Sequence, residues 1–201
     1  MLLAVDIGNT NMEFGVFFKD KLIANFRLVT NRHVTSDEIG LFMRKFFEIQ
    51  NIVYTDIHHV VIVSVVPQVM FSVSNAMRKY LSIEPLIVGE NCEPPIENLY
   101  LNPKEVGMDR LVNAYAAHCA YKGALIIVDY GTATTFDVVN ENGGYEGGCI
   151  FPGIKISMEA LNHNAAKLPR VEIAAPEKVI GKDTVSSMQS GAICGFVGAS
   201  V

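Results

Sequence analysis

A short pattern occurs twice in this chain, 123 positions apart, and it limits the possible folds more than any other part of the sequence. One apolar run ends in Val5-Asp6-Ile7-Gly8 near the start, and another ends in Val128-Asp129-Tyr130-Gly131 in the second half. In both places hydroxyl or amide residues follow the glycine, and a second strand-like segment comes next. Because the same strand–turn–strand context recurs at a fixed offset, the sequence predicts a duplicated domain.

The first half alternates between strand-like and helix-like segments. Short polar joins between the first three strands favour antiparallel hairpins. Ser36 is the expected N-cap of the first helix, because acidic residues follow it and apolar residues then recur at helical spacing. The expected strands are 2–7, 11–18, 22–29, 60–65 and 85–88, and the expected helices are 36–47 and 69–80.

A proline-containing loop at 92–103 separates the two halves, and we place the domain boundary there, giving domains 1–101 and 102–201. The second half is predicted to contain helices at 105–122 and 153–164. Its expected strands are 124–129, 134–139 and 145–151, with Asn142-Gly143-Gly144 as a hairpin turn between the last two. The predicted fold class is therefore α/β, with helices flanking the sheets.

Composition narrows the possible partners and the compartment. The chain has 201 residues and a net charge of −5, which argues against a nucleic-acid partner because the phosphate backbone attracts basic surfaces. The longest apolar stretch, 60–73, is broken by Pro67 and Gln68 and is too short to span a bilayer. No secretory signal is recognisable at the start. The four cysteines are scattered, which is typical of reduced thiols in a cytoplasm.

The first copy of the pattern, Asp6 to Asn11, has the residue types of a phosphate-binding turn. Gly8 leaves space, and successive N–H groups together with Asn9 and Thr10 can donate to phosphate oxygens. A carboxylate beside phosphate needs a cation between them, so Mg²⁺ carrying waters is the natural partner of Asp6. The same residues also make ordinary hairpin turns, and this segment alone leaves both interpretations open.

The second copy, Asp129 to Thr135, strengthens the phosphate interpretation because two such turns can serve one nucleotide. Its three threonines are also favourable in a plain β-strand. The glycines of the segment 147–153 suit a tight turn, or a close approach of the backbone to a ligand.

Gly107-Met108-Asp109-Arg110 lies near the start of a predicted helix, where N–H groups attract anions. A kinase acting on an alcohol needs a carboxylate to accept the hydroxyl proton and cations near the developing phosphate charge. Asp109 and Arg110 supply one of each. Adjacent acidic and basic residues are also common as solvated surface charges.

Taken in order, these motifs resemble the type III pantothenate kinases, which belong to the actin-like superfamily of sugar and acetate kinases. The resemblance covers nearly the whole chain, and the ordered set of motifs is far more specific than any one of them. The matching segments are Asp6 to Asn11, Ser64 to Pro67, Asn102-Pro103, Gly107 to Arg110, Asp129 to Thr135, Gly148 to Gly153, Leu168-Pro169, Asp183-Thr184 and Gln189 to Gly191.

The resemblance implies an actin-like (ribonuclease H-like) duplicated two-domain fold, a homodimer, and ATP-dependent phosphorylation of pantothenate, the first step of coenzyme A synthesis. Asp109 would be the general base, and Asp129 would hold a monovalent cation, K⁺ or NH₄⁺. The ATP phosphate loop would comprise Asp6, Ile7, Gly8, Asn9, Thr10, Asn11, Met12 and Glu13, with Thr132 on the opposing loop. Pantothenate would be bound by Tyr100, Gly107, Met108, Asp109, Arg110 and Thr184, with Thr184 reaching across the dimer interface.

Members of the family continue beyond the stretch that resembles 190–201, with a Gly-Gly turn that contacts the adenosine. The resemblance therefore leads us to expect a further C-terminal segment. Two other functions remain open from the sequence: a kinase of another small alcohol on the same fold, and a nucleotide-binding regulator without turnover.

Overall fold

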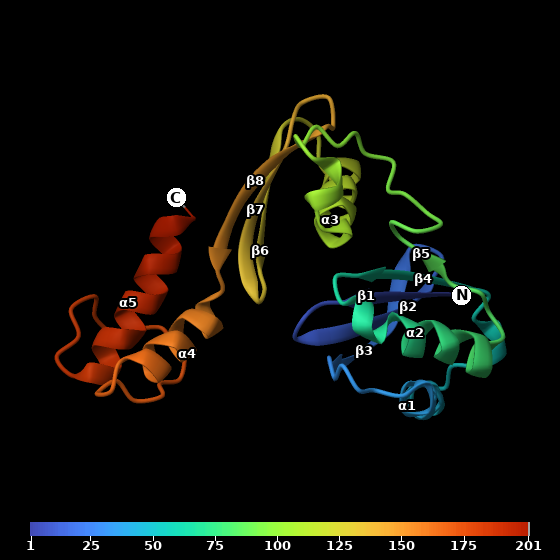
Figure 1. Cartoon of the computed structure of the whole chain (residues 1–201), viewed down its shortest axis with the longest axis horizontal. Helices are drawn as coiled ribbons and strands as arrows, with labels where there is room; N and C mark the ends of the chain where they lie inside the picture. Colours follow the sequence, from blue (N-terminus) through green and yellow to red (C-terminus); the bar gives the residue numbers. More distant parts are fainter. Residues whose placement is uncertain (201) are drawn as a thin grey trace. The chain divides into compact units, whose positions relative to one another are not determined.

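The computed structural model describes residues 1–200, which divide into two compact units. The first unit comprises residues 1–125 together with 139–146, and the second comprises 126–138 together with the chain from 147 onward. Figure 1 shows the elements of both units in sequence colours.

The first unit is built on a five-stranded mixed sheet in the order β3-β2-β1-β4-β5. Strands β1, β2 and β3 form an antiparallel meander, and β1 pairs in parallel with β4, which pairs in parallel with β5. The strands are β1 (Leu2–Ile7), β2 (Asn11–Phe18), β3 (Lys21–Val29), β4 (His59–Ser64) and β5 (Leu86–Ile87).

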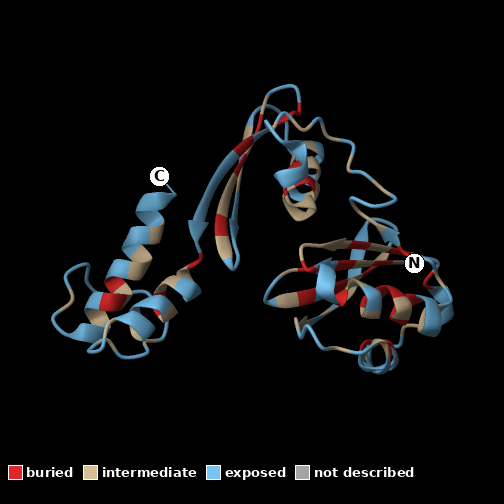
Figure 2. Cartoon of the chain, viewed as in Figure 1, coloured by how far each residue is buried: buried red, intermediate tan, exposed pale blue. Residues whose placement is uncertain are grey.

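One face of this sheet carries the main hydrophobic core. Alternate residues of the strands, such as Leu3, Phe14 and Ile62, point into it and are almost completely buried. Helices α1 (Ser36–Ile49) and α2 (Pro67–Ala76) cover this face and contribute Met43 and Val73, among others. The apolar face that alternation produces on the strands therefore packs against the apolar faces that helical spacing produces on α1 and α2. Figure 2 shows the buried residues along the inner sides of these elements.

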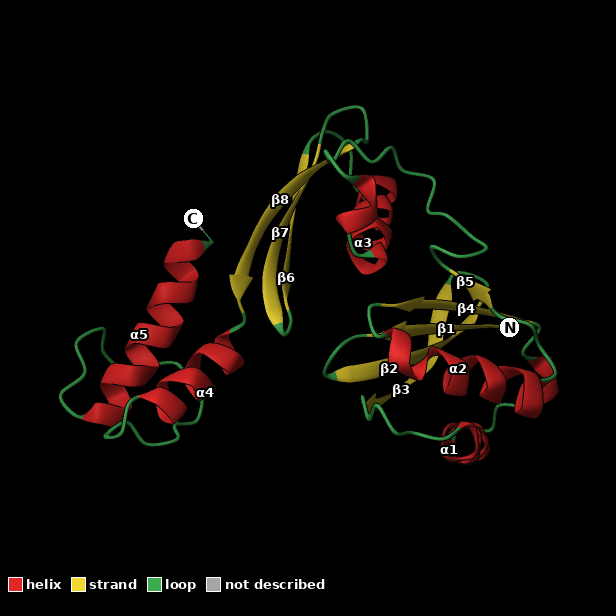
Figure 3. Cartoon of the chain, in the orientation of Figure 1, coloured by secondary structure: helices red, strands yellow, loops and turns green. Residues whose placement is uncertain are grey.

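The first unit has further helical segments after α2. Helix α2 continues into a π-helical turn, Met77–Leu81, and helix α3 spans Met108–Ala120 after a short 3₁₀ turn at Pro103–Glu105. Figure 3 shows the long irregular connection that precedes α3. None of the helices within residues 1–200 is both long and apolar enough to cross a membrane.

The second unit contains most of a three-stranded sheet in the order β6-β7-β8, followed by two helices. The elements are β6 (Leu125–Tyr130), β7 (Ala133–Val139), β8 (Tyr145–Pro152), α4 (Ile154–Asn164) and α5 (Thr184–Ala199). The tip of the β7–β8 hairpin belongs to the first unit. Among the described residues, Met158 and Met188 are the buried apolar side chains of this unit, so its own core is small.

Most predicted elements are confirmed, with differences at three helices. Helix α2 begins at Pro67, not at 69, and the last part of the predicted helix is the π-helical turn Met77–Leu81. The N-cap of α1 is Thr35, not Ser36: the Thr35 hydroxyl accepts from the Glu38 N–H (3.2 Å), and the Glu38 side chain accepts from the Thr35 N–H (2.8 Å). This reciprocal capping box uses the hydroxyl one position earlier than we predicted. Helix α3 begins at Met108, not at 105, because a separate 3₁₀ turn precedes it.

Candidate functional site

The first unit contains a cavity of about 640 Å³ on the face of the sheet opposite the main core. Strand pairing places Asp6 opposite Glu13, and Glu13 opposite Arg27, so these three charged residues form one row across the sheet. All three line the cavity. An Arg27 Nη2–Glu13 Oε1 ion pair (2.5 Å) joins two of them. Asp6, the acidic residue predicted to serve the phosphate-binding turn, therefore lines a cavity.

The rest of the cavity floor changes from small to apolar residues along the strands. In the next row Ala4 pairs with Gly15, and in the row beyond it Leu2 pairs with Phe17. Ala4, Gly15 and Phe17 line the cavity. Leu22 and Phe17 pack over Gly15, where an added Cβ would lie 3.0 Å from Leu22 Cδ1, so this end of the cavity is apolar.

Helix α3 brings Asp109 to the same cavity, together with Val112 and Asn113. Gly107 is the N-cap of this helix, and the Arg110 N–H donates both to the Gly107 carbonyl (3.1 Å) and to Asp109 Oδ1 (2.8 Å). A Cβ on Gly107 would collide with Asp109 Oδ1. The orientation of this carboxylate therefore depends on glycine two positions before it.

The turn between β1 and β2, residues 8–10, has its predicted hairpin form. The Gly8 N–H donates to the Asn11 carbonyl (2.9 Å), and Asn9 and Thr10 are exposed. The flanking side chains of Ile7 and Met12 are fully buried in the core. These two members of the predicted phosphate loop can therefore offer only their backbone to a ligand, while Asn11 is half-buried.

Tyr100 and Arg110, two residues predicted to bind pantothenate, both contact the ring of Tyr145. The ring centroids of Tyr100 and Tyr145 are 6.5 Å apart, and the Arg110 guanidinium carbon lies 5.8 Å from the Tyr145 centroid. Tyr145 is fully buried, and its backbone bonds to Glu97 (2.8 Å) and Leu99 (2.9 Å). The structure therefore brings Tyr100 and Arg110 together around a residue that the sequence analysis did not select.

Met108, the remaining residue of the motif Gly107 to Arg110, packs against the turn that contains Gly89. A Cβ on Gly89, which has a φ of +88°, would lie 2.8 Å from the Met108 Cγ. The side chain of Met108 thus has a packing role in the first unit, beside any contact with a ligand.

In the second unit, Asp129 is the penultimate residue of β6, and Thr132 lies within the two-residue turn, 131–132, between β6 and β7. The Gly131 N–H donates to the Ala133 carbonyl (3.0 Å), and the Gly153 N–H donates to the Thr132 carbonyl (3.1 Å). A Cβ on Gly153 would collide with the Thr132 carbonyl oxygen, and one on Gly148 with that of Phe136. These two glycines are therefore explained by close backbone packing within this unit.

Thr184 is the first residue of α5 and lines a second cavity of about 900 Å³ between α4 and α5. Asp183 caps the helix by accepting from the Ser186 N–H (2.9 Å). This backbone hydrogen bond, followed by the bond from the Ser186 side chain, holds the pKa of Asp183 below its ordinary value.

The carboxylates suit a hydrated divalent ion better than a protein-enclosed metal. Among residues 1–200 no group of three or more His, Cys, Asp or Glu side chains could hold a metal ion. Mg²⁺ in phosphoryl-transfer sites keeps several waters and uses one or two carboxylates together with substrate phosphates. Asp6, a hard oxygen donor on the polar row of the first cavity, fits that requirement.

Three cavity or cluster residues were missed from the sequence: Arg27, Asn113 and Tyr145. Asn113 follows Asp109 by four positions, and helical spacing could have placed it on the same face. Arg27 could have been found only from the register of β2 and β3. Tyr145 lies in a hairpin and carries no local signal of its long-range partners.

A family model described as type III pantothenate kinase matches residues 2–200. The chain belongs to the type III pantothenate kinase family. A type III pantothenate kinase of Finegoldia magna is 50% identical over 198 residues, which are 98% of this chain and 76% of that protein. One from Listeria welshimeri is 49% identical with the same coverage.

The fold agrees with this family assignment. The crystal structure of a Sinorhizobium meliloti protein named as a 2-dehydro-3-deoxygalactonokinase matches with a TM-score of 0.56 and 12% identity. The match covers 100% of this chain and 80% of that one. At this identity the likeness concerns the fold alone, and it confirms the predicted actin-like α/β class of the kinase family.

Proposed function

We propose that this chain transfers the γ-phosphoryl group of ATP to the primary hydroxyl of pantothenate, giving 4′-phosphopantothenate for coenzyme A synthesis. The observation that carries the proposal is the match to the type III pantothenate kinase family over residues 2–200. The cavity that Asp6 and Asp109 share in the first unit supports it. Phosphoryl transfer to an alcohol needs one carboxylate to hold the metal ion and another to accept the hydroxyl proton.

Asp109 is the proposed general base. Its carboxylate accepts the proton of the attacking hydroxyl while the hydroxyl oxygen bonds to the γ-phosphorus and the bond from that phosphorus to the ADP oxygen breaks. The Arg110 N–H hydrogen bond to Oδ1 (2.8 Å) orients the carboxylate before substrate arrives. Proton acceptance and prior orientation are the two contributions we assign to this part of α3.

The β1–β2 turn is the proposed phosphate loop. Asp6 would hold Mg²⁺, which supplies charge neutralisation at the phosphates when bound. Donors of the loop, including backbone N–H groups at Asn9 to Asn11 and the side chains of Asn9 and Thr10, would bind phosphate oxygens. Glu13 is held in an ion pair with Arg27, so its contribution is to the charge of the cavity.

The other roles rest on the family resemblance and are proposed with it. Thr132 contributes to ATP binding, Asp129 holds K⁺ or NH₄⁺, and Thr184 contacts pantothenate from across a homodimer interface. Tyr100 and the segment Gly107 to Arg110 complete the pantothenate site. We also propose the domain boundary at 101/102 and a cytoplasmic location.

A coupled ADP-release assay tests the proposed activity, with ATP, Mg²⁺ and K⁺, run with and without pantothenate. We expect ADP release that depends on pantothenate. Release with another small alcohol, but not with pantothenate, would assign a different kinase substrate. Nucleotide binding without transfer to any acceptor would instead indicate a regulator, and either result would overturn the proposal.

A further inference from the structure

Thr30, the residue directly after β3, makes two hydrogen bonds to the β1–β2 turn. Its hydroxyl donates to the Gly8 carbonyl (2.7 Å), and its N–H donates to the Thr10 carbonyl (2.9 Å). The β2–β3 ladder ends at the pair Asn11–Val29, so both bonds lie beyond the regular sheet. Thr30 therefore holds both ends of the 8–10 turn from a neighbouring strand.

These two bonds determine which way the peptide groups of the turn face. A trans peptide is planar, and its C=O and N–H point in opposite directions. Fixing the Gly8 carbonyl toward Thr30 therefore directs the Asn9 N–H away from Thr30. In the same way, fixing the Thr10 carbonyl toward Thr30 directs the Asn11 N–H away from Thr30. Thr30 thus presets the backbone donors that the proposed phosphate loop needs before a nucleotide arrives.

The corresponding turn of the second unit is held by the same kind of contact. There the Gly153 N–H donates to the Thr132 carbonyl (3.1 Å), which fixes the peptide that carries the Ala133 N–H. In each unit a residue outside the turn accordingly fixes a carbonyl of the turn. The first unit uses a side-chain hydroxyl for one of these bonds, so there the contact can be removed by substitution without changing the backbone.

We propose that Thr30 is a positioning residue for the phosphates of ATP, acting through the carbonyls of Gly8 and Thr10. This inference rests on the proposed function, because it takes the β1–β2 turn as the phosphate loop. It concerns the orientation of donors and assigns Thr30 no contact with the substrate. The half-buried setting of Thr30 protects its hydroxyl bond from competition with water.

Three variants of the whole chain test the role of the hydroxyl. Thr30→Val keeps the shape and removes the hydroxyl, and Thr30→Ser retains it. Ser36→Ala is the matched control, since it removes a half-buried hydroxyl that accepts from Asn75 (3.1 Å) at the start of α1, away from the turn. For each we would measure the Kd of ATP with Mg²⁺ by calorimetry, the KM of each substrate, kcat, and the unfolding midpoint.

We expect Thr30→Val to raise the Kd and KM for ATP by roughly three- to tenfold, the range of one lost hydrogen bond. We also expect it to lower kcat and leave the KM for pantothenate unchanged. Thr30→Ser should restore the affinity for ATP, and Ser36→Ala should leave it at the wild-type value. An unchanged affinity in Thr30→Val, or an equal loss in Ser36→Ala, would overturn the inference.

The calorimetric measurement separates this inference from the proposed function. A wild-type chain that binds ATP but transfers no phosphate to pantothenate would overturn the proposed activity, while the Kd of Thr30→Val would still decide the positioning role. A wild-type chain that binds no nucleotide would overturn both.

Discussion

At the residue scale, Asp109 is the side chain on which the proposed chemistry depends most. Replacing it with asparagine keeps the shape but removes the proton acceptor, so we expect Asp109→Asn to lower kcat by roughly 10²- to 10⁴-fold. The Kd of ATP should change little, because the proposed phosphate donors lie on the turn between β1 and β2 and not on α3. Steady-state kinetics and calorimetry measure the two effects. Glu105→Gln is the control, because Glu105 is an exposed nearby acid that accepts a hydrogen bond from Asn102. Equal kcat values in Asp109→Asn and wild type would exclude Asp109 as the base.

Gly107 gives a second prediction at this scale. A methyl group at position 107 would collide with Asp109 Oδ1, so the carboxylate must turn away from its hydrogen bond with the Arg110 N–H. We therefore expect Gly107→Ala to lower kcat at least several-fold, in keeping with a displaced catalytic group, while the unfolding midpoint stays near the wild-type value. Gly198→Ala in α5, where a Cβ meets nothing within 4 Å, is the control. Wild-type kcat in Gly107→Ala would show that the orientation of Asp109 is not limiting.

The sequence could predict the acids of the site but not their neighbours. Asp6 and Asp109 each lie within a short motif that could be selected as a candidate from the sequence, and the structure brings both to one cavity. Arg27 reaches that cavity because it stands opposite Glu13 in the β2–β3 pairing. Tyr145 meets Tyr100 and Arg110 through a loop bridged to the start of β8. Register and long-range contact decide such positions, and a single sequence does not state either.

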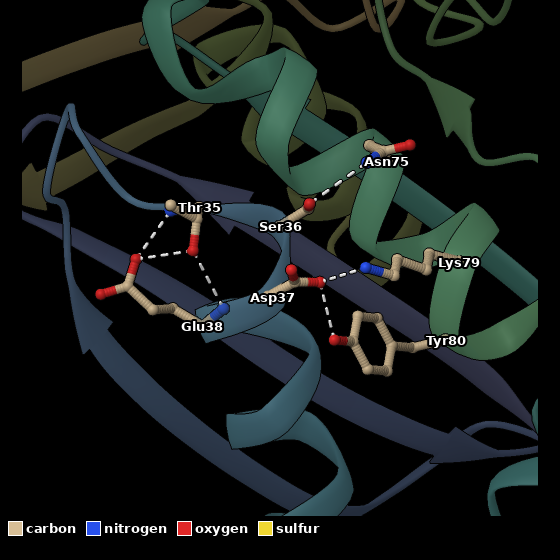
Figure 4. A network of polar contacts seen from close by, with 7 residues as sticks. All are labelled: Thr35, Ser36, Asp37, Glu38, Asn75, Lys79 and Tyr80. Atoms are coloured by element: carbon tan, nitrogen blue, oxygen red, sulfur yellow. Dashed lines mark hydrogen bonds and ion pairs between the residues drawn. The ribbon is translucent and has the colours of Figure 1, made fainter.

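At the scale of elements, the start of α1 is tied to the end of α2 by a polar network (Figure 4). Asp37 accepts from Lys79 Nζ (2.6 Å) and from the Tyr80 hydroxyl (2.8 Å), both of which lie on the π-helical turn. Gly40 lies beneath the Tyr80 ring, where a Cβ would collide with it. The π-helical turn thus places Lys79 and Tyr80 against α1, a long-range consequence that helical periodicity alone could not predict.

This network predicts a pH dependence of stability. The hydrogen bonds from Lys79 and then Tyr80 hold the pKa of Asp37 below its ordinary value. A depressed carboxyl pKa stabilises the fold above the unfolded-state pKa, and the contribution is lost as the pH falls through the folded-state pKa. We therefore expect Asp37→Asn to unfold at a lower temperature than wild type at neutral pH, with the difference shrinking toward about pH 3.

Thermal unfolding followed by circular dichroism over this pH range measures the difference. Asp20→Asn, on the exposed turn between β2 and β3, controls for the loss of a surface carboxylate. A gap between Asp37→Asn and wild type that stays constant on acidification would show that ionisation of Asp37 does not contribute.

At the scale of the whole molecule, the two units differ in how much apolar surface they bury. The first has an extensive core between its sheet and α1 and α2, while Met158 and Met188 are the buried apolar residues described in the second. Helix α5 is rich in apolar residues, yet Val185 and Val197 are 44% and 58% exposed. Apolar burial is the main stabilising term in folding, so the second unit should open more readily than the first.

The proposed homodimer links this difference to protein concentration. We expect amide hydrogens of α4 and α5 to exchange faster than those of β1 and β4 in dilute protein. If a second copy covers α5, their exchange should slow as concentration rises, because association stabilises the folded form by mass action. Val197→Asp places a charge on that helix and should abolish the concentration dependence. Ile49→Asp, at a 63% exposed apolar position on α1, should leave it intact. If the exchange rates of α5 amides in the wild type do not depend on protein concentration, any dimer interface lies elsewhere. A helix covered by a second copy must have its amide hydrogens protected by that copy.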